Sequence, residues 1–159
     1  MAITRLGGAN AISGAITSSN LPTGSVLQVS DMVIITSEQT LSTNTYTDLT
    51  SATINITPNS TSSKIILTAN INAKYDDASV SAYGIKFFRD STNIFTTLHD
   101  YASYVQTDND RLMQFWNYID APSSTSSIAY KIQVASHDNN IVKFQNSAQS
   151  TFYAMEIQG

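Results

Sequence analysis

Two histidine–aspartate pairs are the residues of this chain best suited to acid–base or metal chemistry. His99 precedes Asp100, and His137 precedes Asp138, and we expect each pair to lie in a loop. A zinc site or an acid–base site needs further ligands at a workable spacing. None cluster with either pair in the sequence, so we expect surface histidines in turns and no catalytic residues.

Two oxygen-rich segments suggest a second kind of chemistry, the binding of calcium. Asp76-Asp77 lies in region 76–81, and Asp108-Asn109-Asp110 lies in region 99–110. The second segment lacks the glycine and the terminal glutamate of the twelve-residue calcium loop. Solvated turns are the better interpretation, and the sequence leaves calcium or sugar binding by these loops open. No motif for a nucleophilic serine, a bound phosphate or a zinc protease occurs, and we expect no cofactor.

Aromatic side chains are the remaining candidates for a binding role. Tyr101 and Tyr104 lie in the long polar stretch 100–110, where their rings could stack on the apolar faces of host glycans. The next stretch, 111–120, is apolar on both faces, with Leu112, Trp116 and Tyr118 on one and Met113, Phe115 and Ile119 on the other. It is either a subunit interface or a fully internal strand, and we favour an interface built on Phe115, Trp116 and Tyr118.

The clearest structural pattern in the chain is at 54–73, where the sequence predicts two strands joined by a polar corner. After Lys64, one face carries only apolar residues, namely Ile65, Leu67, Ala69, Ile71 and Ala73. Successive side chains of a strand point to opposite faces, so this period of two predicts a strand with one buried side. The corner is PNSTSS at 58–63, and a second copy, PSSTSS at 122–127, precedes Ile128, Tyr130, Ile132 and Val134.

Short strands with turn signals between them continue along the whole body of the chain. We expect one bent strand or two over 25–36, a polar connection over 37–48, and further strands at about 51–57, 64–74, 83–89, 94–98, 111–120, 127–135, 140–145 and 151–158. No convincing amphipathic helix occurs. Eight to ten strands in this spacing predict an all-β, antiparallel sandwich or jelly roll.

The overall composition fits a single all-β domain with a neutral surface. Charged residues make up 13% of the 159 residues, about half the usual share of roughly 25%, and serine, threonine and asparagine replace them. The net charge of −4 and the scattered basic residues exclude an electrostatic surface for nucleic acid. No cysteine is present, and neither a membrane-spanning apolar run nor a secretory signal occurs.

Residues 1–24 differ from the body at 25–159. They are rich in small residues and repeat Ala-Ile-Thr/Ser around Ile3, Ile12 and Ile16. Isolated isoleucines cannot form a core among themselves, but each could enter a pocket of a partner. The segment is therefore either a flexible leader or an extended docking arm.

Several phrases of the sequence resemble one group of proteins. They are MAITRLGGANAISG, GSVLQV, ITPNSTSSKI, RDSTNI and YIDAPSSTSSIAYKIQ. Together they resemble, over nearly the whole chain and in the same order, small β-rich virion proteins of tailed phages that infect marine and other aquatic bacteria. The strand order is also similar to the jelly roll of tumour-necrosis-factor and complement C1q proteins, in which three subunits pack around an axis.

The resemblance implies a non-enzymatic phage protein on the virion surface. It would be a homotrimeric capsid decoration or head-fibre protein, docked on the major capsid protein or another virion protein through residues 1–24. The alternative is a short tail fibre or receptor-binding tip that touches host glycans through Tyr101 and Tyr104. A third hypothesis is a polysaccharide depolymerase. Such an enzyme needs a cleft with paired carboxylates, and the sequence offers only scattered aspartates for one.

Overall fold

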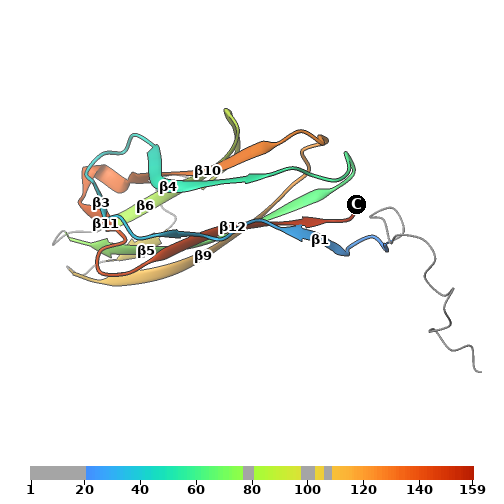
Figure 1. The fold of residues 1–159 in the computed structure, drawn as a ribbon. Helices are drawn as coiled ribbons and strands as arrows, with labels where there is room; N and C mark the ends of the chain where they lie inside the picture. Colours follow the sequence, from blue (N-terminus) through green and yellow to red (C-terminus); the bar gives the residue numbers. More distant parts are fainter. Residues whose placement is uncertain (1–20, 77–80, 98–102, 106–108) are drawn as a thin grey trace, which may run out of the picture.

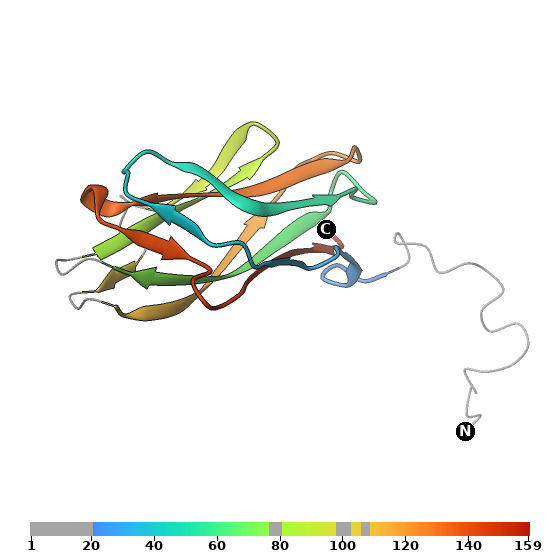
Figure 2. The same ribbon diagram turned by 60° about the vertical axis from the view of Figure 1, so that its left-hand side comes forward.

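The chain forms two antiparallel β-sheets packed face to face, as the computed structural model shows (Figures 1 and 2). The structure describes residues 21–76, 81–97, 103–105 and 109–159. The seven-stranded sheet contains β1 (Val26–Val29), β2 (Val33–Ile35), β3 (Gln39–Leu41), β5 (Lys64–Tyr75), β9 (Arg111–Asp120), β11 (Val142–Phe144) and β12 (Ser150–Ile157). The five-stranded sheet contains β4 (Thr47–Ile56), β6 (Ser81–Arg89), β7 (Thr92–Thr96), β8 (Ser103–Val105) and β10 (Ile128–Ser136).

Each sheet is four strand positions wide, because several short strands share one position. In the seven-stranded sheet, β11 and β12 both pair with the same edge of β5, and β1, β2 and β3 continue outward from them. In the other sheet, β7 and β8 share one edge of β6. The eight positions, numbered along the chain, run 1-8-3-6 in one sheet and 2-7-4-5 in the other. This order is that of a jelly roll, so the predicted fold class is confirmed.

The core forms where the sequence predicts it. The alternating residues of β5, from Ile65 to Ala73, are fully buried, and so are Tyr130, Ile132 and Val134 of β10. Each of these strands follows a serine-rich corner and occupies an inner position of its sheet. Aromatic rings fill the space between the sheets, with Phe87 of β6 stacked at 6.0 Å from Phe152 of β12. Side chains from both sheets thus make one hydrophobic core.

Two elements differ from the prediction over 37–48, which was expected to be a polar connection. Residues Gln39–Leu41 form β3, and β4 begins at Thr47 instead of about residue 51. Leu41 lies opposite Val142 of β11, which is distant in sequence. The Gln39 side chain also accepts a hydrogen bond from the Thr50 backbone at 2.8 Å. Strand formation here depends on these distant partners, and the intrinsic strand propensity of residues 39–48 contains no information about them.

The first strand is attached to the end of the chain. The Gly24 backbone N–H donates to the Gln158 carbonyl at 2.8 Å, and the Gln158 N–H donates to the Ser25 carbonyl at 2.8 Å. Gly24 has a φ of +91°, a conformation that glycine adopts without strain. The hydrogen-bonded body therefore includes Gly24, while residues 1–20 lie outside the described residues.

Candidate binding surfaces

Strand β9 lies at an edge of the seven-stranded sheet. It pairs with β5 over ten consecutive positions, from Ile65↔Asp120 to Lys74↔Arg111, with no register shift. Within the described part of the chain, no second strand pairs with β9. Its other side therefore presents a long row of backbone N–H and C=O groups that no described strand covers.

One face of β9 belongs to the core. Tyr118 and Trp116 are partly buried and pack against Phe95 of β7, with ring centroids 5.5 and 6.5 Å apart. The Trp116 indole N–H also points to the Tyr83 hydroxyl, with a nitrogen–oxygen distance of 3.4 Å. Leu112, which the sequence analysis placed on this face, is 36% exposed. Trp116 and Tyr118 thus help to join the two sheets within one subunit.

The opposite face of β9 is apolar and open. Phe115 is 68% exposed, Ile119 is 60% exposed and Met113 is 51% exposed. Of the three residues predicted for a subunit interface, the structure brings Trp116 and Tyr118 together and places Phe115 on the other side of the strand. A partner that docks on this face would meet Phe115 directly.

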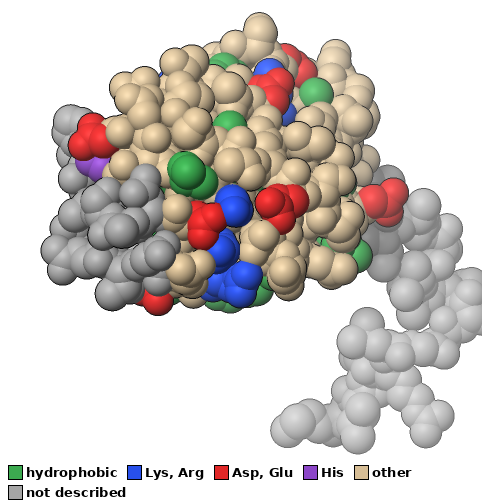
Figure 3. Space-filling model, turned by 90° about the vertical axis from the view of Figure 1, so that its left-hand side faces the viewer, with side chains coloured by type: hydrophobic (Ala, Val, Ile, Leu, Met, Phe, Trp, Pro, Cys, Tyr) green, Lys and Arg blue, Asp and Glu red, His purple; other side chains and the backbone are tan. Residues whose placement is uncertain are grey.

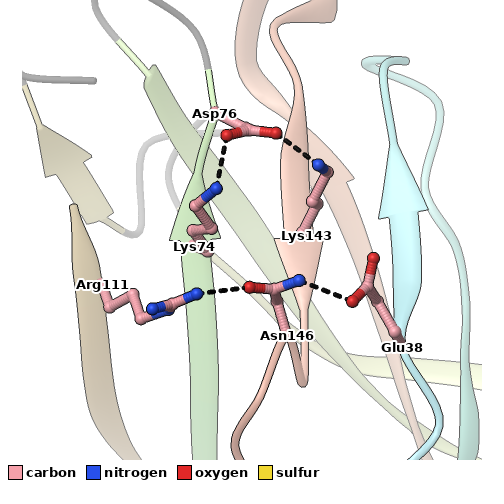
Figure 4. A network of polar contacts seen from close by, with 6 residues as sticks. All are labelled: Glu38, Lys74, Asp76, Arg111, Lys143 and Asn146. Carbon is pink, nitrogen blue, oxygen red and sulfur yellow. Dashed lines mark hydrogen bonds and ion pairs between the residues drawn. The ribbon is translucent and has the colours of Figure 1, made fainter. Parts of the chain in front are cut away.

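A cluster of lysine, arginine, aspartate and glutamate side chains lies at one end of the sandwich (Figure 3). There Asp76 forms ion pairs with Lys143 of β11 and, at 2.6 Å, with Lys74 of β5 (Figure 4). The hydrogen bonds from Lys143 and Lys74 lower the pKa of Asp76 to about 2. Because two ammonium groups already neutralise this carboxylate, Asp76 is poorly suited to hold calcium. Its neighbour Asp77 lies outside the described residues.

A second chain of contacts lies beside the first (Figure 4). Arg111 of β9 donates to the Asn146 side-chain oxygen at 2.6 Å, and the Asn146 amide donates to Glu38 at 2.6 Å. These contacts join β9 to the β11–β12 connection and to the residue before β3. The charges at this end hold segments of the chain to one another.

The histidine–aspartate pairs do not assemble a metal site in the described residues. His137 and Asp138 lie in a short 3₁₀ turn, η2 (His137–Asn139), with His137 Nε2 at 3.0 Å from an Asp138 carboxylate oxygen. The Asp138 side chain is 77% exposed. No group of three or more histidine, aspartate or glutamate side chains in the described ranges could hold a metal ion. His99 and Asp100 lie outside those ranges.

The predicted glycan and docking residues are largely outside the described structure. Tyr101 and the isoleucines Ile3, Ile12 and Ile16 fall in the undescribed ranges. Tyr104 is in β8, where its backbone lies opposite Ala82 of β6. A glycan contact at Tyr101 and Tyr104, and a docking role for the isoleucines, therefore stay predictions.

Two buried carboxylates went unnoticed in the sequence because their partners are far away along the chain. The carboxylate of Asp120, at the end of β9, accepts hydrogen bonds from Arg89 at 3.0 Å and from the Tyr130 hydroxyl at 2.7 Å. Burial and the bond to Asp120 raise the pKa of Tyr130. Arg89 and Tyr130 belong to the five-stranded sheet, so this contact ties the two sheets together.

The second carboxylate, Glu156 of β12, is fully buried without a cationic partner in any described contact. It accepts hydrogen bonds from the Asn59 backbone at 2.6 Å, the Asn59 amide at 2.7 Å and the Gln28 amide at 2.6 Å. Burial raises the pKa of Glu156, but hydrogen bonds that include those from Gln28 and Asn59 outweigh it and hold the pKa below its usual value. Glu156 thus fixes the first serine-rich corner to β12 and β1.

A membrane-spanning helix is absent from the described residues, and the hollow described there is small. The described residues contain no helix that is long and apolar enough to cross a membrane. A hollow of about 250 Å³ lies between β2 and β4, lined by Asp31, Val33, Thr53, Ile54 and Asn55. It is smaller than the roughly 300–1,000 Å³ typical of ligand pockets. The broad outer face of the seven-stranded sheet is the more prominent candidate surface.

These features define a jelly-roll β-sandwich. No protein-family model matches the chain, and no curated protein matches it either. Solved structures with a similar fold come from infectious bursal disease virus. For the Gx strain the TM-score is 0.54 at 12% identity over 85% of this chain, and for the Gt strain it is 0.50 at 10% identity over 82%. The VP2 subviral particle of the same virus gives a TM-score of 0.48 at 11% identity over 85%.

The likeness concerns one part of larger proteins. This chain spans about a third of the Gx and Gt chains, 34% and 33% respectively. At these identities the similarity establishes a shared fold, and a fold by itself does not determine function.

Proposed function

We propose that this protein is a non-enzymatic structural component of a phage particle, a capsid decoration or head-fibre protein on the virion surface. The observation that carries the proposal is the jelly-roll fold, which is similar over 85% of the chain to a structure of a virus. Jelly rolls recur in viral capsids but also in lectins and cupins. The resemblance of the sequence phrases to tailed-phage virion proteins favours the first of these.

In this proposal the protein is a homotrimer that binds the phage particle through residues 1–24. An exposed apolar face, beside a strand edge that no described strand pairs with, supports association of the body with another protein. The isoleucines Ile3, Ile12 and Ile16 would supply apolar contacts to the major capsid protein or to another virion protein. Since Gly24 is hydrogen-bonded to Gln158, the body would hold the last residue of this arm.

Immunogold electron microscopy of the phage that encodes this chain tests the proposal, with an antibody raised against residues 21–159. Gold distributed over the head is the expected result. Gold confined to the tail would reject decoration of the capsid and favour a receptor-binding tip, in which case binding to host glycans through Tyr101 and Tyr104 becomes the question. Purified particles that carry no gold would overturn a virion role.

Deletion of residues 1–20 tests the docking arm separately. The body should remain folded, because the first described hydrogen bonds between the start and the end of the chain involve Gly24 and Ser25. The truncated protein should then be missing from particles when it replaces the full chain. Normal incorporation of the truncated protein would show that the arm does not dock it.

A further inference from the structure

An apolar row crosses the full width of the seven-stranded sheet on its outer side. Ile119 of β9 lies directly opposite Ile66 of β5. Ile66 in turn lies opposite Met155 of β12, and Met155 lies opposite Val29 of β1. Residues directly opposite each other in antiparallel strands share one face at about 5 Å between their β-carbons. The four side chains therefore form one continuous row.

The row widens into a surface that we call the outer face, defined by Val29, Ile66, Met113, Phe115, Ile119 and Met155. Four of these residues are at least half exposed, and Ile66 and Met155 are partly buried beside them. Large exposed apolar side chains of this number, gathered on one sheet, are unusual for a protein that functions alone.

Two pairs of polar side chains within the outer face are hydrogen-bonded to each other. Thr68 donates its hydroxyl hydrogen to Asn117 at 3.0 Å, and the Asn70 amide donates to the Thr151 hydroxyl at 3.1 Å. These residues stand between apolar neighbours on β5, β9 and β12. Because these donors already have partners, a second surface could cover them at a small cost in lost hydrogen bonds to water.

Charge is confined to the ends of the outer face. Lys74 and Arg111 stand at one end and are engaged with Asp76 and Asn146. Lys64 stands at the other end, opposite Ile157. The outward positions of β5, β9 and β12 between these ends are neutral. A charged partner such as nucleic acid or an acidic polysaccharide would find no complementary group there.

We propose that the outer face is an interface between copies of this chain, with β9 at its margin. This inference deepens the proposed function, because it identifies the surface that would build the oligomer. Four strand positions spaced by about 4.8 Å, and the twelve residues of β5 at about 3.4 Å each, give the whole outer side of the sheet, charged ends included, an area of about 800 Å². Stable interfaces bury about 800 Å² on each partner, so an interface centred on the outer face has room on this side of the sheet.

A second copy is the partner that this surface fits best. The face is neutral and apolar, so the same face of a second copy has matching chemistry, whether two copies meet across a two-fold axis or three copies meet around a three-fold axis. Strand β9 also lacks the bulges and central charges that usually protect an exposed strand edge. Its ten-residue length makes it a template for pairing or packing unless another chain covers it.

Light scattering coupled to size-exclusion chromatography on the full-length chain tests the inference. The wild type should have a mass of at least two chains of 17.3 kDa each. Phe115→Asp should reduce the mass to that of one chain, while circular dichroism and the melting temperature stay close to wild type. The milder Phe115→Ser should weaken the oligomer in the same direction, which guards against a folding defect in the first variant.

Thr53→Asp is the matched control, because Thr53 is exposed on the outer side of the other sheet and lies opposite Lys131. It should leave the oligomer intact. A wild type that stays monomeric at tens of micromolar would overturn the interface. An oligomer that survives both Phe115 variants would overturn it as well.

The outcomes separate this inference from the proposed function. A mass of three chains that Phe115→Asp abolishes supports both the interface and the trimer. A mass of two chains that Phe115→Asp reduces to one chain supports the interface and rejects the trimer. An oligomer that depends on Phe115, together with particles free of gold, would keep the interface and reject the virion role.

Discussion

The outer surfaces of the two sheets have opposite chemistry. On the five-stranded sheet, Asp48 pairs with Lys131 at 3.1 Å and accepts a hydrogen bond from Gln133 at 2.7 Å. Lysine ammonium groups also lie over aromatic rings there, with Lys86 4.0 Å from the centre of the Tyr46 ring. The outer face of the seven-stranded sheet instead carries uncovered apolar side chains and neutral polar pairs.

This difference shows which part of the surface the fold requires. Both sheets bury their inner sides in the same core, and the five-stranded sheet does so with a polar exterior. A jelly roll therefore does not need an apolar outer side to be stable. The exposed residues of the outer face are better explained by contact with another protein than by the stability of one subunit.

The largest loss of stability should come from Trp116→Asp, which replaces a side chain on the inner side of β9. Comparison with Phe115→Asp, on the outer side, tests which side of β9 is buried. Trp116 packs against the core, so the substitution places an unpaired charge there and should cost about 3–5 kcal/mol of the free energy of unfolding. We expect the folded protein to be lost or strongly destabilised, as measured by denaturant unfolding. Phe115→Asp, one residue away on the outer face, should unfold near the wild-type midpoint. A stable, oligomeric Trp116→Asp protein would contradict the assigned inner side.

Asp120→Ala should have the next largest effect, because Asp120 is 6% exposed and joins the two sheets. Removal of its carboxylate leaves the Tyr130 hydroxyl and Arg89 without this acceptor and should lower the free energy of unfolding by about 2–4 kcal/mol. Chemical denaturation measures the change. Full stability in this variant would mean that the contact contributes nothing to the joining of the sheets.

Glu156→Gln should change both stability and its dependence on pH. The folded pKa of Glu156 lies below its ordinary value of 4.5, so the ionised group stabilises the protein above pH 4.5. That contribution is lost as pH falls through the lower, folded pKa. A glutamine would turn an N–H₂ group toward the donors of Gln28 and Asn59, which should cost about 1.5–3 kcal/mol at pH 7.

The same variant should show a shallower loss of stability below pH 4.5 than the wild type, as measured by denaturant unfolding across pH 2–7. Glu38→Gln is the control, since Glu38 is exposed and a single described hydrogen bond joins it to Asn146. An unchanged pH profile in Glu156→Gln would show that Glu156 does not produce the acid sensitivity.

The smallest effect should come from Asp48→Ala on the outer surface of the five-stranded sheet. Its side chain is 58% exposed, and surface ion pairs contribute less than about 1 kcal/mol. The hydrogen bond from Gln133 and the ion pair with Lys131 hold the pKa of Asp48 below its usual range. A small change in the melting temperature and an unchanged oligomeric mass are expected. Dissociation of the oligomer would place the interface on this sheet instead.

The sequence predicted the parts of the fold that depend on local pattern. The alternation from Ile65 to Ala73 identified the buried side of β5, and the two serine-rich corners marked the strands that occupy inner positions. The bend near Ser30-Asp31 divided the first apolar stretch into β1 and β2, one of the two arrangements expected. Each of these features follows from side chains that alternate along one strand.

Features that depend on distant partners could not be predicted in this way. Strand β3 forms against β11, and the Asp120 and Glu156 carboxylates find their hydrogen bonds on strands and corners far away in sequence. The sequence placed Met113, Phe115 and Ile119 on one face of this strand, but the predicted interface combined residues of both faces, namely Phe115, Trp116 and Tyr118. Ile66, Met155 and Val29 were not recognised as its neighbours.

The sequence by itself determined that 111–120 would be a strand with two apolar faces, because side-chain period and composition are local properties. Only the tertiary structure decided which face is internal. Pairing with β5 turns Trp116 toward Phe95 and leaves Phe115 outside. That choice depends on the register between strands 49 residues apart, where Thr68 meets Asn117, and no pattern within either strand encodes it.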